Sequence, residues 1–103
     1  MTDVLEKVGY VDSLIRRLSH RDPEVRLRAA EILSFIGTLP AFRGIVLAAR
    51  DPDQEVRVKV TRALETLDSK DGNEILNELQ SDPDKRVRKY TTWALQRLRA
   101  KSS

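Results

Sequence analysis

The sequence predicts an all-α fold, an α-solenoid built from three pairs of helices. Two observations carry this prediction: a short motif occurs three times, and the same helical pattern of apolar residues follows each copy. No stretch alternates apolar and polar residues between turn residues, so we expect no strands. We expect one domain, residues 1–103, with repeats over approximately 3–37, 38–68 and 69–101.

The repeated motif is an Asp-Pro pair followed by a Val-Arg pair. The Val-Arg pairs stand at 25–26, 56–57 and 87–88, a spacing of 31 residues in both intervals. After each valine, residues at offsets 4, 7, 8 and 11 lie on one face of an α-helix and are apolar with one exception, a threonine. These residues are Ala29, Ile32, Leu33 and Ile36, then Val60, Ala63, Leu64 and Leu67, then Thr91, Ala94, Leu95 and Leu98.

Each of these three helices has a start signal. Asp22, Asp51 and Asp82 each come directly before a proline. We expect each aspartate to cap its helix, because a carboxylate there accepts hydrogen bonds from the free N–H groups of the first turn. The proline then suits the first helical position, where no N–H is needed.

Another segment with helical apolar spacing precedes each of these helices. We expect one helix over about residues 3–19, one that starts near Pro40 after the break at 37–38, and one over about residues 71–80. Their inward side chains are predicted to be Val4, Leu5, Val8, Val11, Leu14, Ile15 and Leu18, then Phe42, Ile45, Val46 and Leu47, then Ile75, Leu76 and Leu79. Six helices in three antiparallel pairs follow.

The segment 22–37, which runs from Asp-Pro-Glu-Val-Arg through Ala-Ala to a closing glycine, resembles the second helix of a HEAT-like repeat. It is similar to the short repeats of prokaryotic and phycobilisome-lyase-like HEAT proteins. The resemblance implies a right-handed stack with the first helices on the convex side and the second helices on the concave side. It also implies a ladder of charged residues that ties neighbouring repeats together. The ladder residues would be Asp22, Arg26, Asp51, Arg57, Asp82 and Arg88.

Composition and charge exclude several classes of protein. Hydrophobic residues make up 40% and charged residues 34%, and no window approaches the ~20 apolar residues of a membrane span. The chain has no cysteine, so disulfides are excluded and we expect a cytoplasmic protein. The net charge is +3, but residues 84–103 hold seven basic residues and one acidic residue. This basic end indicates either an anionic partner or a solvated terminal helix.

Nothing in the sequence predicts an enzyme. The sole histidine, His20, has no second histidine or cysteine to share a metal with, and the four glycines are isolated from one another. We therefore expect no catalytic residues, no metal site and no cofactor.

A binding surface is predicted where the second helix of each pair points away from the core, at offsets 2, 3, 6 and 10 from the valine. Leu27, Val58 and Thr66 are among these positions. The candidate partner-binding residues are Arg28, Glu31, Phe35, Lys59, Arg62, Lys89, Tyr90, Trp93 and Arg97. Aromatic rings and arginines are enriched at binding hot spots, which makes this set unusual for a plain helix surface.

Alternatives remain for the three aromatic side chains. Trp93 either binds a partner or folds over the last turn of its own helix, and Tyr90 is expected to lie partly in the core. Phe35 is either free or covered by the loop 37–42.

Three functions fit these residues. The first is an adaptor that binds a protein or peptide in the concave groove of the second helices. The second is nucleic-acid binding, with bases stacked on Trp93 and phosphates held by Lys59, Arg62, Lys89 and Arg97. The third is a self-assembling structural module, in which case the chain forms a homo-oligomer.

Overall fold

The chain is a helical solenoid, as predicted. The computed structural model describes the backbone of residues 2–102 and the side chains of residues 9–102. That part of the chain contains six helices and no strand. The helices are α1 (Thr2–Arg17), α2 (Pro23–Ile36), α3 (Leu39–Ala48), α4 (Gln54–Leu67), α5 (Lys70–Leu79) and α6 (Lys85–Ser102).

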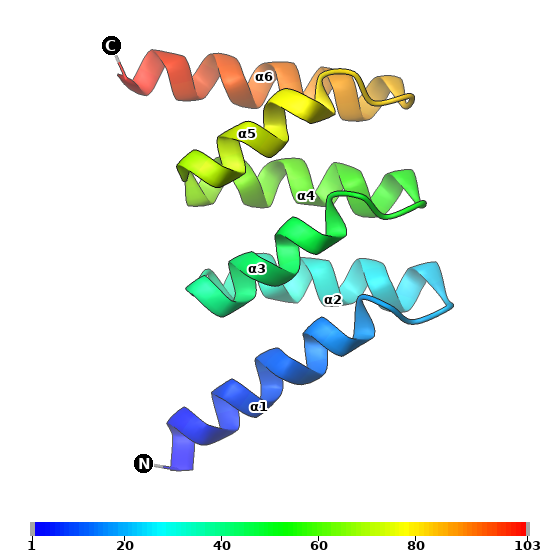
Figure 1. Ribbon diagram of the computed structural model, residues 1–103, viewed down its shortest axis with the longest axis vertical. Helices are drawn as coiled ribbons and strands as arrows, with labels where there is room; N and C mark the ends of the chain where they lie inside the picture. The colour runs from blue at the N-terminus through cyan, green and yellow to red at the C-terminus, as the bar shows by residue number, and fades with distance from the viewer. Residues whose placement is uncertain (1, 103) are drawn as a thin grey trace.

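The helices form two layers (Figure 1). Helices α1, α3 and α5 make one layer and cross obliquely over α2, α4 and α6, which run side by side in the other. Within the second layer α4 packs between α2 and α6. Helix α4 therefore shows one face to the first-helix layer, its two flanks to α2 and α6, and one face to solvent.

The core is made by the predicted apolar pattern. The residues at offsets 4, 7, 8 and 11 are buried or half-buried in all three copies. Of the first-helix residues, Val11, Leu14, Phe42, Ile45, Leu76 and Leu79 are buried and Ile15, Leu18, Val46 and Ile75 half-buried, as predicted. Val4, Leu5 and Val8 lie outside the residues whose side chains are described.

One inward prediction, Leu47, is wrong. Its side chain is 66% exposed, because the buried stripe of α3 runs through Ala41, Phe42, Ile45 and Ala48. Leu47 lies five residues beyond Phe42, which at 3.6 residues per turn turns it well away from that stripe.

The predicted start is right for α2 and wrong for α4 and α6. The Asp22 carboxylate caps α2 and accepts a hydrogen bond from the Glu24 N–H. In the later copies Asp51 and Asp82 lie two residues too early, and the caps are made by Asp53 and Asp84. The prolines at 52 and 83 therefore precede the helices, whereas Pro23 is the first residue of α2.

The helix starts are set by a constant number of residues between the capping aspartate and the motif valine. Asp22, Asp53 and Asp84 each stand three residues before the valine of the Val-Arg pair in their repeat. That distance puts the cap at the helix end while the valine points inward. In the second and third copies the Asp-Pro pair stands two residues farther from the valine than in the first, so it falls in the loop.

The displaced aspartates form the inter-repeat ladder. Arg26 donates from Nε and Nη2 to the Asp51 carboxylate at 2.9 and 3.3 Å. Arg57 donates in the same way to Asp82, at 2.8 and 3.1 Å. Both pairs are largely buried and join residues 25 apart in the chain. The ladder is thus present between successive repeats, but Asp22 takes no part in it.

Candidate protein-binding site

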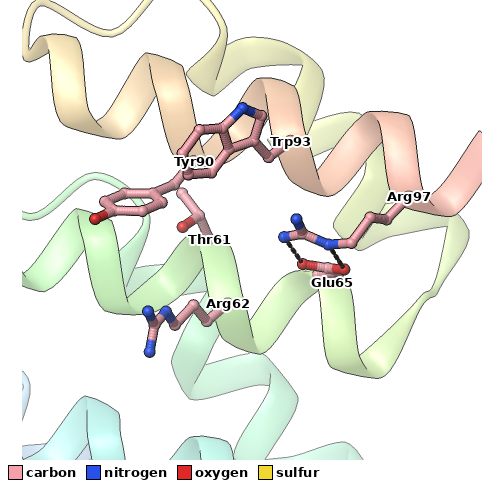
Figure 2. A pocket seen from close by; sticks show the side chains of 6 residues that line it. All are labelled: Thr61, Arg62, Glu65, Tyr90, Trp93 and Arg97. Atoms are coloured by element: carbon pink, nitrogen blue, oxygen red, sulfur yellow. Dashed lines mark hydrogen bonds and ion pairs between the residues drawn. The ribbon is translucent and has the colours of Figure 1, made fainter.

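A small pocket lies between α4 and α6 on the outer face of the second helices (Figure 2). Its volume is about 180 Å³. Its lining residues are Thr61, Arg62 and Glu65 from α4, and Tyr90, Trp93 and Arg97 from α6. Four of the nine predicted binding residues thus meet at one place.

The two aromatic rings of the pocket pack against each other. Tyr90 and Trp93 make an edge-to-face contact with ring centroids 5.7 Å apart and planes at 76°, which is a favoured geometry for aromatic pairs. Tyr90 is half-buried, as predicted, and Trp93 keeps 42% of its surface exposed. The tyrosine therefore fixes one side of the tryptophan and leaves the rest free.

Two cations flank these rings. The Lys89 Nζ lies 4.9 Å from the centroid of the Trp93 ring, and the Arg62 guanidinium lies 6.0 Å from the centroid of the Tyr90 ring. Both distances are within the range of cation–π attraction. Neither Lys89 nor Arg62 has an ion pair with a carboxylate in the described part of the chain. Their charges stay available to a partner.

Arg97 differs, because a carboxylate already occupies it. Its Nε and Nη2 donate to Glu65 at 2.6 and 2.7 Å (Figure 2). The hydrogen bond from Arg97 lowers the pKa of Glu65, and the same contact raises the pKa of Arg97. Arg97 thus closes one wall of the pocket and carries little free charge.

Thr61 and Glu65 are the two pocket residues that the sequence did not predict. A helical pattern places the face of each helix separately and does not pair one helix with the next. A signal was present: Glu65 and Arg97 are 32 residues apart, close to the repeat spacing of 31, and have opposite charges. Arg86 and Glu55, at a separation of 31, form a second such pair.

The other candidates lie outside the pocket. Lys59 and Glu31 form an exposed ion pair at 3.5 Å between α4 and α2. Arg28 is exposed on α2. Phe35 is 90% exposed, so the loop that follows α2 does not cover it. These residues share the second-helix layer with the pocket but do not contribute to its lining.

The outward prediction at offset 2 is wrong for Leu27 and Val58. Both side chains are half-buried and pack against the core cluster. The third copy has Lys89 at the same offset, and that side chain is exposed.

Neither a metal cluster nor a membrane span appears in the described residues. They contain no group of three or more His, Cys, Asp or Glu side chains able to hold a metal ion. Nδ1 of His20 accepts a hydrogen bond from the Asp22 N–H at 3.0 Å, which gives this side chain a role in the loop. Within residues 2–102, no helix has both the length and the apolar character needed to cross a membrane.

Helix pairs stacked in two layers and tied by a charged ladder define a helical repeat protein. Residues 42–103 match a family model described as HEAT repeats, which covers more than half of the chain. The chain belongs to the HEAT repeat family. Repeats of this family generally mediate protein–protein interactions, and the fold is typically non-catalytic.

A solved structure supports the fold. The crystal structure of an engineered protein superposes with a TM-score of 0.62 at 24% sequence identity. The match covers 93% of this chain and 48% of that one, so this chain spans about half the length of the engineered protein. No curated protein sequence matches the chain significantly.

Proposed function

We propose that the chain is a non-enzymatic adaptor that binds a protein partner on the outer face of α2, α4 and α6. The observation that carries the proposal is the pocket around Trp93. The Trp93 ring contacts Tyr90 edge to face and is nearly half exposed. Lys89 lies beside Trp93 and Arg62 beside Tyr90, and neither cation has an ion pair among the described residues. Rigid, partly exposed aromatic rings and arginines are the side chains that carry most of the energy in protein interfaces.

The size of the pocket favours a side chain of a partner as its occupant. Pockets for small molecules usually begin at roughly 300 Å³, and this one measures about 180 Å³. An aromatic or aliphatic side chain of a partner would cover Trp93 while its backbone runs along the second-helix layer. The family resemblance implies that this layer is the concave side of the stack.

The charges of the same face argue against nucleic acid. Lys59 and Arg97 already have carboxylate partners, and Arg86 donates to Glu55 at the edge of the face. A phosphate backbone would have to displace or tolerate these carboxylates, which repel it. A peptide that offers a single carboxylate or aromatic side chain can meet Lys89 beside Trp93, or Arg62 beside Tyr90, without lying along those carboxylates.

The test is an affinity capture from a lysate of the source organism with wild-type bait and a Trp93→Ala/Arg62→Ala bait. Leu47→Ala is a matched control, because Leu47 is an exposed apolar residue of the other layer. We expect a protein that survives nuclease treatment, that the control retains and that the double variant loses. Circular dichroism of each bait shows that the loss is not unfolding.

Trp93 also offers a direct readout, because it is the sole tryptophan of the chain. Addition of the captured partner should shift its fluorescence emission. Three results would reject the proposal: a double variant that keeps the partner, material that disappears with nuclease, or a captured partner that is the chain itself.

A further inference from the structure

The flank of α6 that points away from α4 carries an incomplete copy of the ladder. The Nη1 of Arg88 donates to the backbone oxygens of Asp82 and Pro83 at 2.7 and 3.0 Å. Its Nε and Nη2 donate to no described residue, although Arg88 holds the same place in its repeat as Arg26 and Arg57.

The two complete copies show what this arrangement binds. Arg26 and Arg57 also anchor Nη1 on a backbone oxygen six residues earlier, at 2.7 Å in each case. With that anchor in place, their Nε and Nη2 both donate to one carboxylate, which is a bidentate pair. The Arg88 anchor has the same donor, the same acceptor position and the same length. Its guanidinium is therefore already oriented for a carboxylate before any partner arrives.

We propose that Arg88 is the centre of a second docking surface, which binds an Asp or Glu carboxylate in an acidic segment of a partner protein. The planar fork of arginine matches a carboxylate with two parallel hydrogen bonds. Pre-orientation by the backbone anchor reduces the entropy that binding would otherwise cost. Arg88 lies outside the pocket at Arg62, and the two surfaces meet at Trp93, which lines both.

The side chains around Arg88 suit an acidic partner. Lys85, Lys89 and Thr92 line a shallow depression with Arg88 and the edge of Trp93, with a volume of about 440 Å³. The described residues provide no carboxylate partner for Lys85 or Lys89. The basic end of the sequence is thus only partly neutralised, since Arg86 and Arg97 have carboxylates and these cations do not.

The same residues disfavour an apolar helix pair as the occupant. Where the earlier copies have Leu27 and Val58, which pack against the core cluster, this copy has Lys89, a charged and exposed side chain. A second copy of this chain is disfavoured as well. The position that corresponds to Asp51 and Asp82 in the first repeat is His20, which accepts the same loop hydrogen bond but has no carboxylate to offer.

The test is a titration followed by NMR, which detects each arginine Nε–Hε group separately. The probe is a short oligoglutamate peptide, and oligoglutamine of the same length is the uncharged control. We expect saturable shifts of the Arg88 Nε–Hε signal with oligoglutamate only, and smaller shifts for Arg26 and Arg57, which are already bound to carboxylates.

Three variants make the test specific. Arg88→Gln should raise the dissociation constant about tenfold, and Arg88→Lys should lose most of the same affinity because it keeps the charge but not the fork. Arg99→Gln removes an equal charge from the same helix and should change the constant less than about twofold. Arg62→Ala should still bind the probe, because Arg62 lines the pocket and not this depression, so this proposal and the adaptor proposal can fail separately.

Opposite results would overturn the proposal. Equal losses in Arg88→Gln and Arg99→Gln would show that only net charge matters. Full retention by Arg88→Lys would show that the fork is not used. Tighter binding of a single-stranded oligonucleotide of equal charge than of oligoglutamate would replace the carboxylate with a phosphate. An Arg88 signal that does not move with any probe would remove the site.

Discussion

The ladder allows one comparison in which nearly everything except the ion pair is held constant. Arg57 and Arg88 occupy the same place in successive repeats and make the same backbone anchor at 2.7 Å. Arg57 also binds Asp82, whereas Arg88 binds no carboxylate in the described part of the chain. Alanine at either position removes the anchor, but only Arg57→Ala removes the link between repeats.

The expected magnitudes follow from burial. The side chains of Arg57 and Asp82 are 13% and 5% exposed. Removal of Arg57 leaves the Asp82 carboxylate nearly buried with one backbone donor, so Arg57→Ala should cost about 3 kcal/mol. Arg88 is exposed, and Arg88→Ala should cost about 1 kcal/mol or less. We therefore expect a difference of about 2 kcal/mol between the two variants.

Urea unfolding followed by circular dichroism measures this difference. With a slope of about 1.5 kcal/mol per molar urea, a difference of about 2 kcal/mol moves the midpoint by roughly 1.3 M. The slopes should stay equal, since both variants unfold the same surface. Equal midpoints for the two variants would refute the reasoning, because the inter-repeat carboxylate would then contribute nothing to stability.

Three further predictions test other parts of the structure. Asp53→Asn should change the free energy of unfolding by less than about 0.5 kcal/mol, since asparagine caps a helix as well as aspartate does. Asp51→Asn should lower the free energy of unfolding by about 1.5 kcal/mol, because it weakens the bond to Arg26. Equal losses in urea unfolding would contradict the two-residue shift of the helix start. The hydrogen bond from Arg97 lowers the pKa of Glu65 below 4.5. The stability that this pair adds to the folded state is therefore complete above that pH and is lost as the pH falls through the lowered pKa of the folded state. Thermal melts from about pH 7 to about pH 3 should therefore show less acid destabilisation in Glu65→Gln than in wild type, and identical acid curves would mean that the pair is not formed. Thr91→Val should raise the free energy of unfolding by about 1 kcal/mol, because the buried Thr91 hydroxyl has no partner among the described residues. If the variant melts at a lower temperature than wild type, the hydroxyl has a partner such as a bound water.

The fold was predictable because the same helix-pair pattern occurs three times in the sequence. A single amphipathic pattern fixes a helix face only locally, but three copies at a constant spacing also predict that successive helices stack with the same register. The buried residues Leu33, Leu64 and Leu95 illustrate this, since each stands eight residues after its valine. Leu47 was predicted to point inward and does not. Helix α3 has only ten residues, so the apolar pattern repeats too few times to define the inner face of the helix.

The helix starts failed for a different reason. Asp-Pro is a strong local signal, and in the first repeat it coincides with the cap. In the other two repeats a second aspartate three residues before the valine competes for the same role. Distance to the buried valine decides between them, because core packing sets where the helix must begin. The aspartate that loses the competition becomes the ladder residue.

The candidate site was predictable in its side chains and not in its pairing. Trp93, Tyr90 and Arg62 could be selected because they are unusual on an outward helix face. Whether a cation on that face is free depends on what the neighbouring helix places opposite it, as Arg97 and Glu65 show. That information lies in the rotation of one helix against the next, which a single helical pattern does not contain.

The salt bridges of α6 explain why its aromatic pair can act as a fixed binding element. Arg86 pairs with Glu55 near the start of the helix, and Arg97 pairs with Glu65 three turns later, so both bridges fasten α6 to α4. Eleven residues of helix separate the two arginines, a rise of about 16 Å, and Trp93 lies between them. A ring held in this way loses little freedom when a partner covers it. The individual bridges are exposed and contribute little stability, so their main effect is to set the position of α6 against α4.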